Sequence, residues 1–160
     1  MTPSPRPGYV PLPRSTTSRQ PSVLPADAFS LALDLELKRA RLSRGAFTLV
    51  VFEATRPSDD GWTGDAAAAK ELCRVIRACV READLLGETG NGTLTLVLAD
   101  AGAKDSQRAI TRLISRVEAS DLLQSRQLTV GVASFPDQGF DADSLRQRAR
   151  SRLVVIGAHA

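Results

Sequence analysis

Residues 81–98 read READLLGETGNGTLTLVL, and this stretch decides the fold. Two apolar runs, Leu85-Leu86 and Leu94 to Leu98, lie on either side of Gly90-Asn91-Gly92. Asparagine followed by glycine adopts the positive φ angles that a tight hairpin turn requires. The stretch therefore predicts a β-hairpin, and the rest of the chain is interpreted around it.

An Arg-x-x-Asp pattern, Arg81 to Asp84, comes directly before this hairpin. Arg81 follows the last turn of a predicted helix, and Asp84 opens the first predicted strand. The two side chains, a cation and a carboxylate, are therefore expected to emerge together at a helix–strand junction. Such a pair is suited to binding a polar ligand.

Hairpin and pattern together resemble the GGDEF domains, the bacterial synthases of cyclic di-GMP. Members of that family carry their signature on this hairpin, and many have an Arg-x-x-Asp inhibitory site five residues before the first glycine. Here five residues also separate Asp84 from Gly90. The signature has become Gly90-Asn91-Gly92-Thr93-Leu94, which keeps the first glycine and lacks both acids. The resemblance implies a degenerate, non-catalytic GGDEF domain that retains the RxxD inhibitory site.

Composition and charge indicate one globular domain that does not bind nucleic acid. The 160 residues are enough for a single ordinary core, and 42% are hydrophobic and 24% charged. The net charge of +3 is accounted for by Arg6, Arg14 and Arg19, near the N-terminus. The remaining chain is neutral overall, which argues against a nucleic acid polymer as partner.

Neither a membrane span nor a disulfide is expected. No stretch approaches the roughly 20 apolar residues of a transmembrane helix, and the N-terminus lacks the apolar core of a secretory signal. Cys73 and Cys79 are separated by about 9 Å along one predicted helix, which is beyond disulfide reach. We therefore expect no membrane association, reduced cysteines and a cytoplasmic location.

The chain divides into a tail and a domain. Residues 1–25 contain seven of the nine prolines and no acid, so they are predicted to be a disordered tail. Two interpretations of this tail stay open: a plain linker, or a docking segment for a protein partner. Residues 26–160 are predicted to form the GGDEF-like domain.

The predicted elements of that domain follow a ferredoxin-like order. A strand at 46–54, a helix at 66–80, the hairpin, a helix at 104–119 and a strand at 127–134 give β-α-β-β-α-β. Extra helices at 27–43 and 141–153 extend both ends. The fold class is thus α+β, an α/β sandwich, with Asp27 and Asp65 as expected N-caps and Gly45 after the first helix.

The resemblance also identifies what remains of a catalytic site. In the family, acids at the end of the first core strand hold magnesium together with acids of the signature. Here Glu53 is the one acid at that strand end, because the second position is Thr55. A lone carboxylate makes a poor magnesium site, so no magnesium, no cofactor and no cyclase activity are expected. The remnant positions are Glu53, Asp65, Gly90, Asn91, Gly92 and Thr93.

The segment from Thr55 to Asp65 gives a second reason to expect no activity. By this resemblance it is too short for the guanine-recognising turn of the family, and it contains no asparagine. Trp62 lies in it and has two interpretations, a stacking platform for a base or a cover over the shortened region.

The ligand site implied by the resemblance consists of Arg81, Asp84 and Arg112, with Arg108 as an accessory cation one helical turn before Arg112. An arginine fork binds phosphate oxygens or the O6/N7 edge of guanine, and a carboxylate accepts from the guanine N1–H and N2–H edge. By contrast, the arginines between Arg146 and Arg152 spread over two sides of a helix and are interpreted as a solvated face.

These residues favour a cyclic di-GMP receptor that makes no cyclic di-GMP itself. A ligand-bridged homodimer is a corollary, because in the family the ligand often binds as a stacked pair between two domains. The alternative is a ligand-free pseudoenzyme that serves as a protein–protein interaction module.

Overall fold

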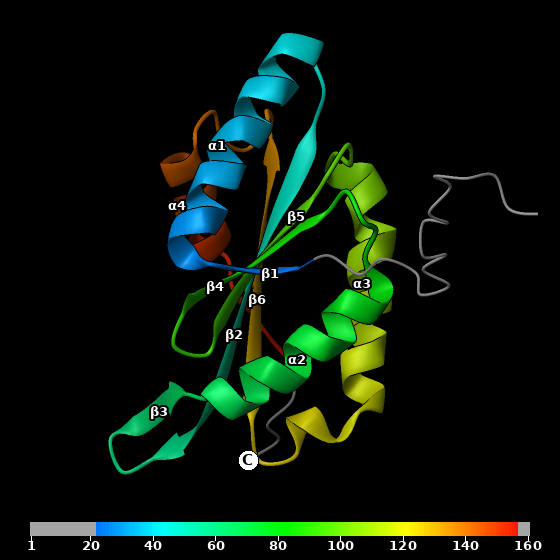
Figure 1. The fold of residues 1–160 in the computed structure, drawn as a ribbon. Helices are drawn as coiled ribbons and strands as arrows, with labels where there is room; N and C mark the ends of the chain where they lie inside the picture. The colour runs from blue at the N-terminus through cyan, green and yellow to red at the C-terminus, as the bar shows by residue number, and fades with distance from the viewer. Residues whose placement is uncertain (1–21, 157–160) are drawn as a thin grey trace, which may run out of the picture.

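The computed structural model describes residues 22–156, which form one sheet between two pairs of helices (Figure 1). Within this range the seven-stranded sheet has the order β1-β4-β5-β2-β6-β7, and β3 pairs with β2 off this path. The strands are β1 Val23–Pro25, β2 Phe47–Ser58, β3 Gly61–Gly64, β4 Leu85–Gly90, β5 Thr93–Leu98, β6 Gln127–Phe135 and β7 Val154–Ile156. The helices are α1 Ala26–Ser43, α2 Ala66–Cys79, α3 Ala103–Ala119 and α4 Ala142–Ser151, with a 3-10 turn at Asp121–Leu123.

Strand β2 is the centre of the sheet and is buried on both faces, as its continuous apolar run predicts. Val50 and Phe52 point into the core under α2 and α3, whereas Leu49 and Val51 point into the core under α1 and α4. The inner strands run β4-β5-β2-β6 with antiparallel neighbours. This is the predicted ferredoxin-like core, and the predicted α+β fold class is confirmed.

The β4–β5 hairpin is confirmed, with a difference in its turn. Gly90 pairs with Thr93, so the loop consists of Asn91 and Gly92. Gly92 alone has a positive φ, of 73°, so the expectation that Asn91 shares this conformation is wrong. A bulge between Glu88 and Gly90 changes the register before the turn and removes the need for two left-handed residues.

The predicted helix at the start of the domain is present as α1. The buried residues recur with helical spacing, and they are Phe29, Leu33, Leu37 and Ala40. Both predicted ends of this helix are shifted toward the N-terminus, the N-cap by two positions and the left-handed residue by one. Pro25 occupies the N-cap, so Asp27 lies inside the first turn, and Arg44 rather than Gly45 has the left-handed φ, of 52°.

Three short strands correct the predicted boundaries. Val23–Pro25, assigned to the disordered tail, forms β1 and pairs in parallel with β4. The rest of the predicted tail, residues 1–21, lies outside the described residues. Residues 55–65, expected to be a loop, continue β2 and return as β3, which carries a half-exposed Trp62. Helix α4 ends at Ser151 rather than at Leu153, and β7 then pairs with β6.

Other expectations concern the cysteines and membranes. Cys73 and Cys79 are free, and burial raises the pKa of the Cys73 thiol. In the described part of the chain, no helix has both the length and the apolar character needed to cross a membrane.

Candidate functional site

Asp84 is a buried anchor at the junction between α2 and β4. Its side chain is only 1% exposed. One carboxylate oxygen, Oδ2, accepts the backbone N–H of Arg81 at 2.8 Å, and Oδ1 accepts the backbone N–H of Ala99 at 3.0 Å. These bonds tie the turn before β4 to the chain that leaves β5. The carboxylate therefore holds the backbone of Arg81 in place.

The Arg81 side chain extends from this anchor toward solvent. Its Nη2 donates to the Ala99 carbonyl oxygen at 2.6 Å and lies 3.6 Å from Oδ1 of Asp84. The side chain is nevertheless 65% exposed. Arg81 is therefore held in place at one edge of its guanidinium and remains accessible to a ligand.

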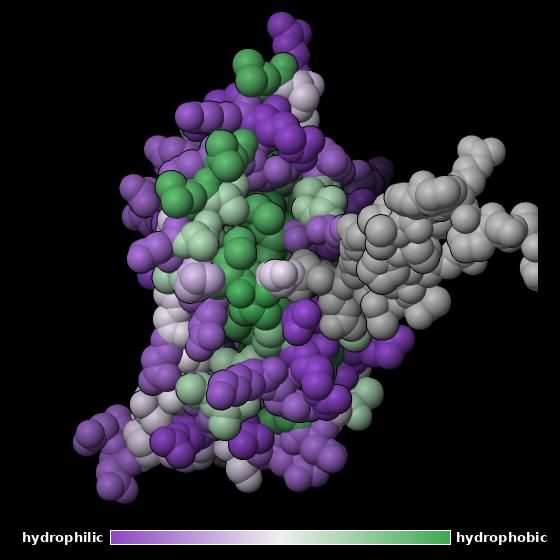
Figure 2. Space-filling model, viewed as in Figure 1, coloured by the Kyte–Doolittle hydropathy of each residue, from purple (hydrophilic) through white to green (hydrophobic). Residues whose placement is uncertain are grey.

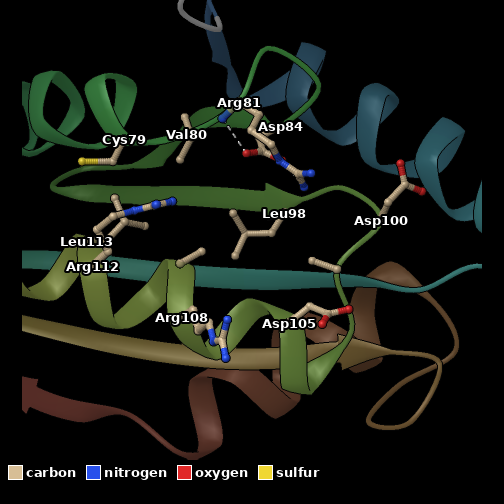
Figure 3. Close-up of a pocket in the computed structure, with 12 residues that line it drawn as sticks. Cys79, Val80, Arg81, Asp84, Leu98, Asp100, Asp105, Arg108, Arg112 and Leu113 are labelled. Atoms are coloured by element: carbon tan, nitrogen blue, oxygen red, sulfur yellow. Dashed lines mark hydrogen bonds and ion pairs between the residues drawn. The ribbon is translucent and has the colours of Figure 1, made fainter.

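A cavity of about 400 Å³ opens beside this pair, between the α2–β4 junction and helix α3. Figure 3 shows Arg81 and Asp84 on one side and Asp105, Arg108 and Arg112 along α3 on the other. The floor is apolar and includes Leu98, Ala101, Ala109 and Leu113. The structure thus brings together all the predicted ligand residues: Arg81, Asp84, Arg112 and the accessory Arg108.

The acids around this cavity leave the α3 arginines available. Asp84 is committed to backbone N–H groups, and Asp100 forms an ion pair with Arg39, Nη2 to Oδ1, at 3.1 Å. Asp105 lies in the first turn of α3, where the helix dipole favours a negative charge. Within residues 22–156 neither Arg108 nor Arg112 forms an ion pair. In this part of the chain the cavity lining therefore carries three arginines and three acids, and the two α3 arginines form no ion pair with those acids.

The geometry revises the predicted role of Asp84. A carboxylate that contacts a guanine edge has to be exposed, but both oxygens of Asp84 are buried and bonded to the backbone. Asp84 acts instead as a positioning residue for Arg81. Two features of the site were not predicted from the sequence. The Ala99 carbonyl oxygen accepts a hydrogen bond from Arg81, and the acids Asp100 and Asp105 line the cavity.

The positions predicted to be remnants of a catalytic site lie at the opposite end of the strands, around the β4–β5 turn. Glu53 on β2 pairs with Thr93 on one side and with Thr129 on the other. The Gly92 carbonyl oxygen accepts the Ala54 N–H at 2.8 Å, and a Cβ on Gly92 would lie 2.6 Å from the Ala54 oxygen. The turn is thus packed tightly, backbone against backbone.

Asp65 has a structural role at this end of the sheet. It caps α2 by accepting the Ala68 N–H at 3.0 Å, as predicted, and it pairs with Nε of Arg126 at 2.9 Å. The Ala68 N–H, and with a smaller effect Arg126, lower the pKa of this carboxyl despite its burial. Within residues 22–156 no three acidic, histidine or cysteine side chains are grouped to hold a metal. Glu53 with Thr93 opposite it does not fit a magnesium ion.

Solved structures similar to this one include GGDEF domains. A DGC protein from Thermotoga maritima superposes with a TM-score of 0.69 at 17% identity, over 83% of this chain and 97% of that one. The GGDEF domain of PA1120 (TpbB or YfiN) from Pseudomonas aeruginosa gives 0.67 at 25% identity, over 81% of each chain. A microbial GGDEF domain described with cyclic di-GMP gives 0.62 at 15% identity, over 81% of this chain and 84% of that one.

These similarities define the class of the domain. The chain has the GGDEF-domain fold over most of its length. No family model and no curated protein sequence matches it.

Proposed function

We propose that this chain is a catalytically inactive GGDEF domain that acts as a cyclic di-GMP receptor or effector. The observation that carries the proposal is that Arg81, from the α2–β4 junction, and Arg108 and Arg112, from α3, line one cavity of about 400 Å³. Cyclic di-GMP presents two phosphodiesters and two guanines, and each arginine fork can bind either group in a bidentate manner. Arg81 and Arg112 are assigned to these contacts, and Asp84 holds Arg81 in position.

Inactivity is proposed from the remnant positions. Glu53 faces Thr93, and the turn supplies the backbone of Gly92 where carboxylates would be needed. A triphosphate and a 3′-hydroxyl then lack metal-held oxygens to position and neutralise them. Cyclic di-GMP formed from GTP and magnesium above a control without protein would contradict this part of the proposal.

Arg112→Ala is expected to weaken cyclic di-GMP binding at least tenfold. The side chain is exposed and forms no ion pair within the described residues, so its loss should leave the fold intact. A hydrogen bond to a charged group contributes about 1.5–3 kcal/mol, which corresponds to roughly a tenfold change or more. Calorimetric titration of the wild-type and variant chains with cyclic di-GMP measures the difference.

Arg116→Ala is the matched control, because Arg116 lies one turn further along α3 and does not line the cavity. It should bind cyclic di-GMP as tightly as wild type. Equal affinity in Arg112→Ala and wild type would refute the assignment of the ligand to this cavity. If the ligand binds as a stacked pair, sedimentation should also detect more homodimer after cyclic di-GMP is added than before.

A second candidate function, protein–protein interaction, is favoured by the outer face of α1. Leu31, Leu35 and Leu42 are 68%, 66% and 88% exposed. Figure 2 shows hydrophobic side chains gathered over α1 on this face of the molecule. With Ala28 and Lys38 the three leucines follow alternating spacings of three and four residues, the pattern of a helix that packs against another helix.

The occupant proposed for this face is α1 of a second copy, in antiparallel orientation. Asp27 and Asp34 lie in the first half of the helix, and Lys38 and Arg41 lie in the second half. An antiparallel pair related by a two-fold axis places each acidic half opposite a basic half. The surface is therefore complementary to itself in charge.

Leu35→Asp is expected to abolish a ligand-free dimer measured by sedimentation at high protein concentration. Leu153→Asp, a matched change of an exposed leucine outside α1, should leave the dimer unchanged. A wild-type chain that stays monomeric without ligand would eliminate this second candidate and leave the cyclic di-GMP proposal untouched.

A further inference from the structure

The end of β2 and strand β3 form a two-stranded ribbon that projects from one end of the sheet (Figure 1). The pairing of β2 with β6 ends at Thr55. From Arg56 to Ser58, the partner of β2 among the described residues is β3. Residues 56–62 are all exposed, so the outer part of this ribbon adds nothing to the core and is accessible to a partner.

The ribbon carries an apolar platform. Trp62 lies directly opposite Pro57 in the register, so the indole and the pyrrolidine ring are neighbours on one face. Trp62 is 49% exposed. Exposed aromatic rings bind proline-rich segments, because such segments are already extended and lose little conformational entropy on binding. The platform therefore favours a proline-rich ligand.

The tip of the ribbon favours a ligand that is also basic. Asp59 and Asp60 form the turn between the two strands, and in the described part of the chain neither forms an ion pair. Two adjacent carboxylates repel each other, and a bound cation relieves this repulsion. Arg56 does not supply that cation, because it lies close enough to Asp65 to lower the pKa of that carboxyl.

We propose that the ribbon platform, formed by Pro57, Asp59, Asp60 and Trp62, binds residues 3–14 of the same chain. This segment reads PSPRPGYVPLPR. It contains five prolines, two arginines and no acid, and it is therefore complementary to the platform in both ring chemistry and charge.

The segment is long enough to reach the platform. Strand β1 lies three strands from β2, and Val23 is level with Val50 through β4 and β5. Pro57 is seven residues beyond Val50, so the separation is roughly 14 Å across the strands and 23 Å along them, about 27 Å in all. A proline-rich chain spans about 3.1 Å per residue, so residues 3–13 reach from about 31 to 62 Å before Val23. This leaves length for the chain to reverse direction, which is necessary because β1 already runs toward the hairpin turn, parallel to β4.

Trp62 is the one tryptophan of the chain, so quenching of tryptophan fluorescence by acrylamide reports on this platform alone. The full chain is measured at low salt, where charge attraction is screened least. Asp59→Lys/Asp60→Lys should raise the quenching constant about twofold, because release of the segment uncovers one face of the indole ring. Arg6→Glu/Arg14→Glu should raise it equally. The chain with all four substitutions should return to the wild-type value, because its charges are complementary again.

Asp137→Lys/Asp143→Lys is the matched control, since it reverses two exposed acids outside the ribbon and should leave the quenching constant unchanged. Protection of Trp62 that is independent of protein concentration supports binding within one chain. Protection that rises with concentration would overturn this and assign the segment to a second copy. An equal rise of the quenching constant in the control, or no recovery in the chain with four substitutions, would overturn the proposal as a whole.

Discussion

Asp84→Ala is expected to lower the free energy of unfolding by about 3 kcal/mol or more and to weaken cyclic di-GMP binding. The substitution removes a buried carboxylate that accepts two backbone N–H groups, from Arg81 and Ala99. Each such bond to a charged group contributes about 1.5–3 kcal/mol, and the Ala99 N–H would be left buried without a partner. Urea unfolding measures the loss, and calorimetry measures the affinity of the folded fraction.

Two comparisons make this test specific. Asp105→Ala removes an exposed acid from the same cavity and should change stability by no more than about 0.5 kcal/mol. Asp84→Asn keeps one oxygen acceptor and should lose part of the stability. A stable Asp84→Ala variant would show that the buried carboxylate is not the anchor of the α2–β4 junction.

Gly131→Ala is expected to destabilise the domain by about 3 kcal/mol through the packing of α4 on β6. A Cβ at this position would lie 2.0 Å from the carbonyl oxygen of Ala149 and 2.7 Å from its carbon, both of them backbone atoms. Helix α4 has to move away, and overpacking of this kind costs about 1–3 kcal/mol, occasionally more. Thermal or urea unfolding measures the effect.

The same variant should keep its cyclic di-GMP site. No residue of α4 lines the Arg81–Arg112 cavity, so cyclic di-GMP binding should persist in the folded protein. Gly102→Ala is the control, because its added Cβ meets nothing closer than the Ala46 side chain at 3.6 Å. Equal stability of Gly131→Ala and wild type would contradict the close approach of α4 to the sheet.

The core of the fold was predictable because its elements carry strong patterns. The buried run of β2, the Asn-Gly hairpin and the Asp65 cap each have a local physical cause, and each is present in the structure. The strands β1, β3 and β7 have three or four residues each and no pattern of their own. They form because a neighbouring strand offers a free edge, and that information lies elsewhere in the chain.

The candidate site was predictable in its members and not in its geometry. Arg81, Arg108 and Arg112 meet as the spacing suggested. The burial of Asp84 depends on the Ala99 N–H, 15 residues away, which no side-chain pattern reveals. Similarly, the spacing of the α4 arginines predicts a solvated face, whereas Arg146 is half-buried and its Nη2 donates to the Ser30 hydroxyl at 3.2 Å. Ser30 lies on α1, so the pattern within α4 does not reveal this contact.

Cyclic di-GMP binding at the Arg81–Arg112 cavity can be tested residue by residue with amide chemical shifts. In a titration of the ¹⁵N-labelled chain with cyclic di-GMP, saturable shifts should centre on Arg81, Ala99 and the α3 turn around Arg112. The amides of Glu53, Gly92 and Thr93 should stay unchanged. Shifts centred on those three residues, or no shifts at all, would contradict the proposed receptor site.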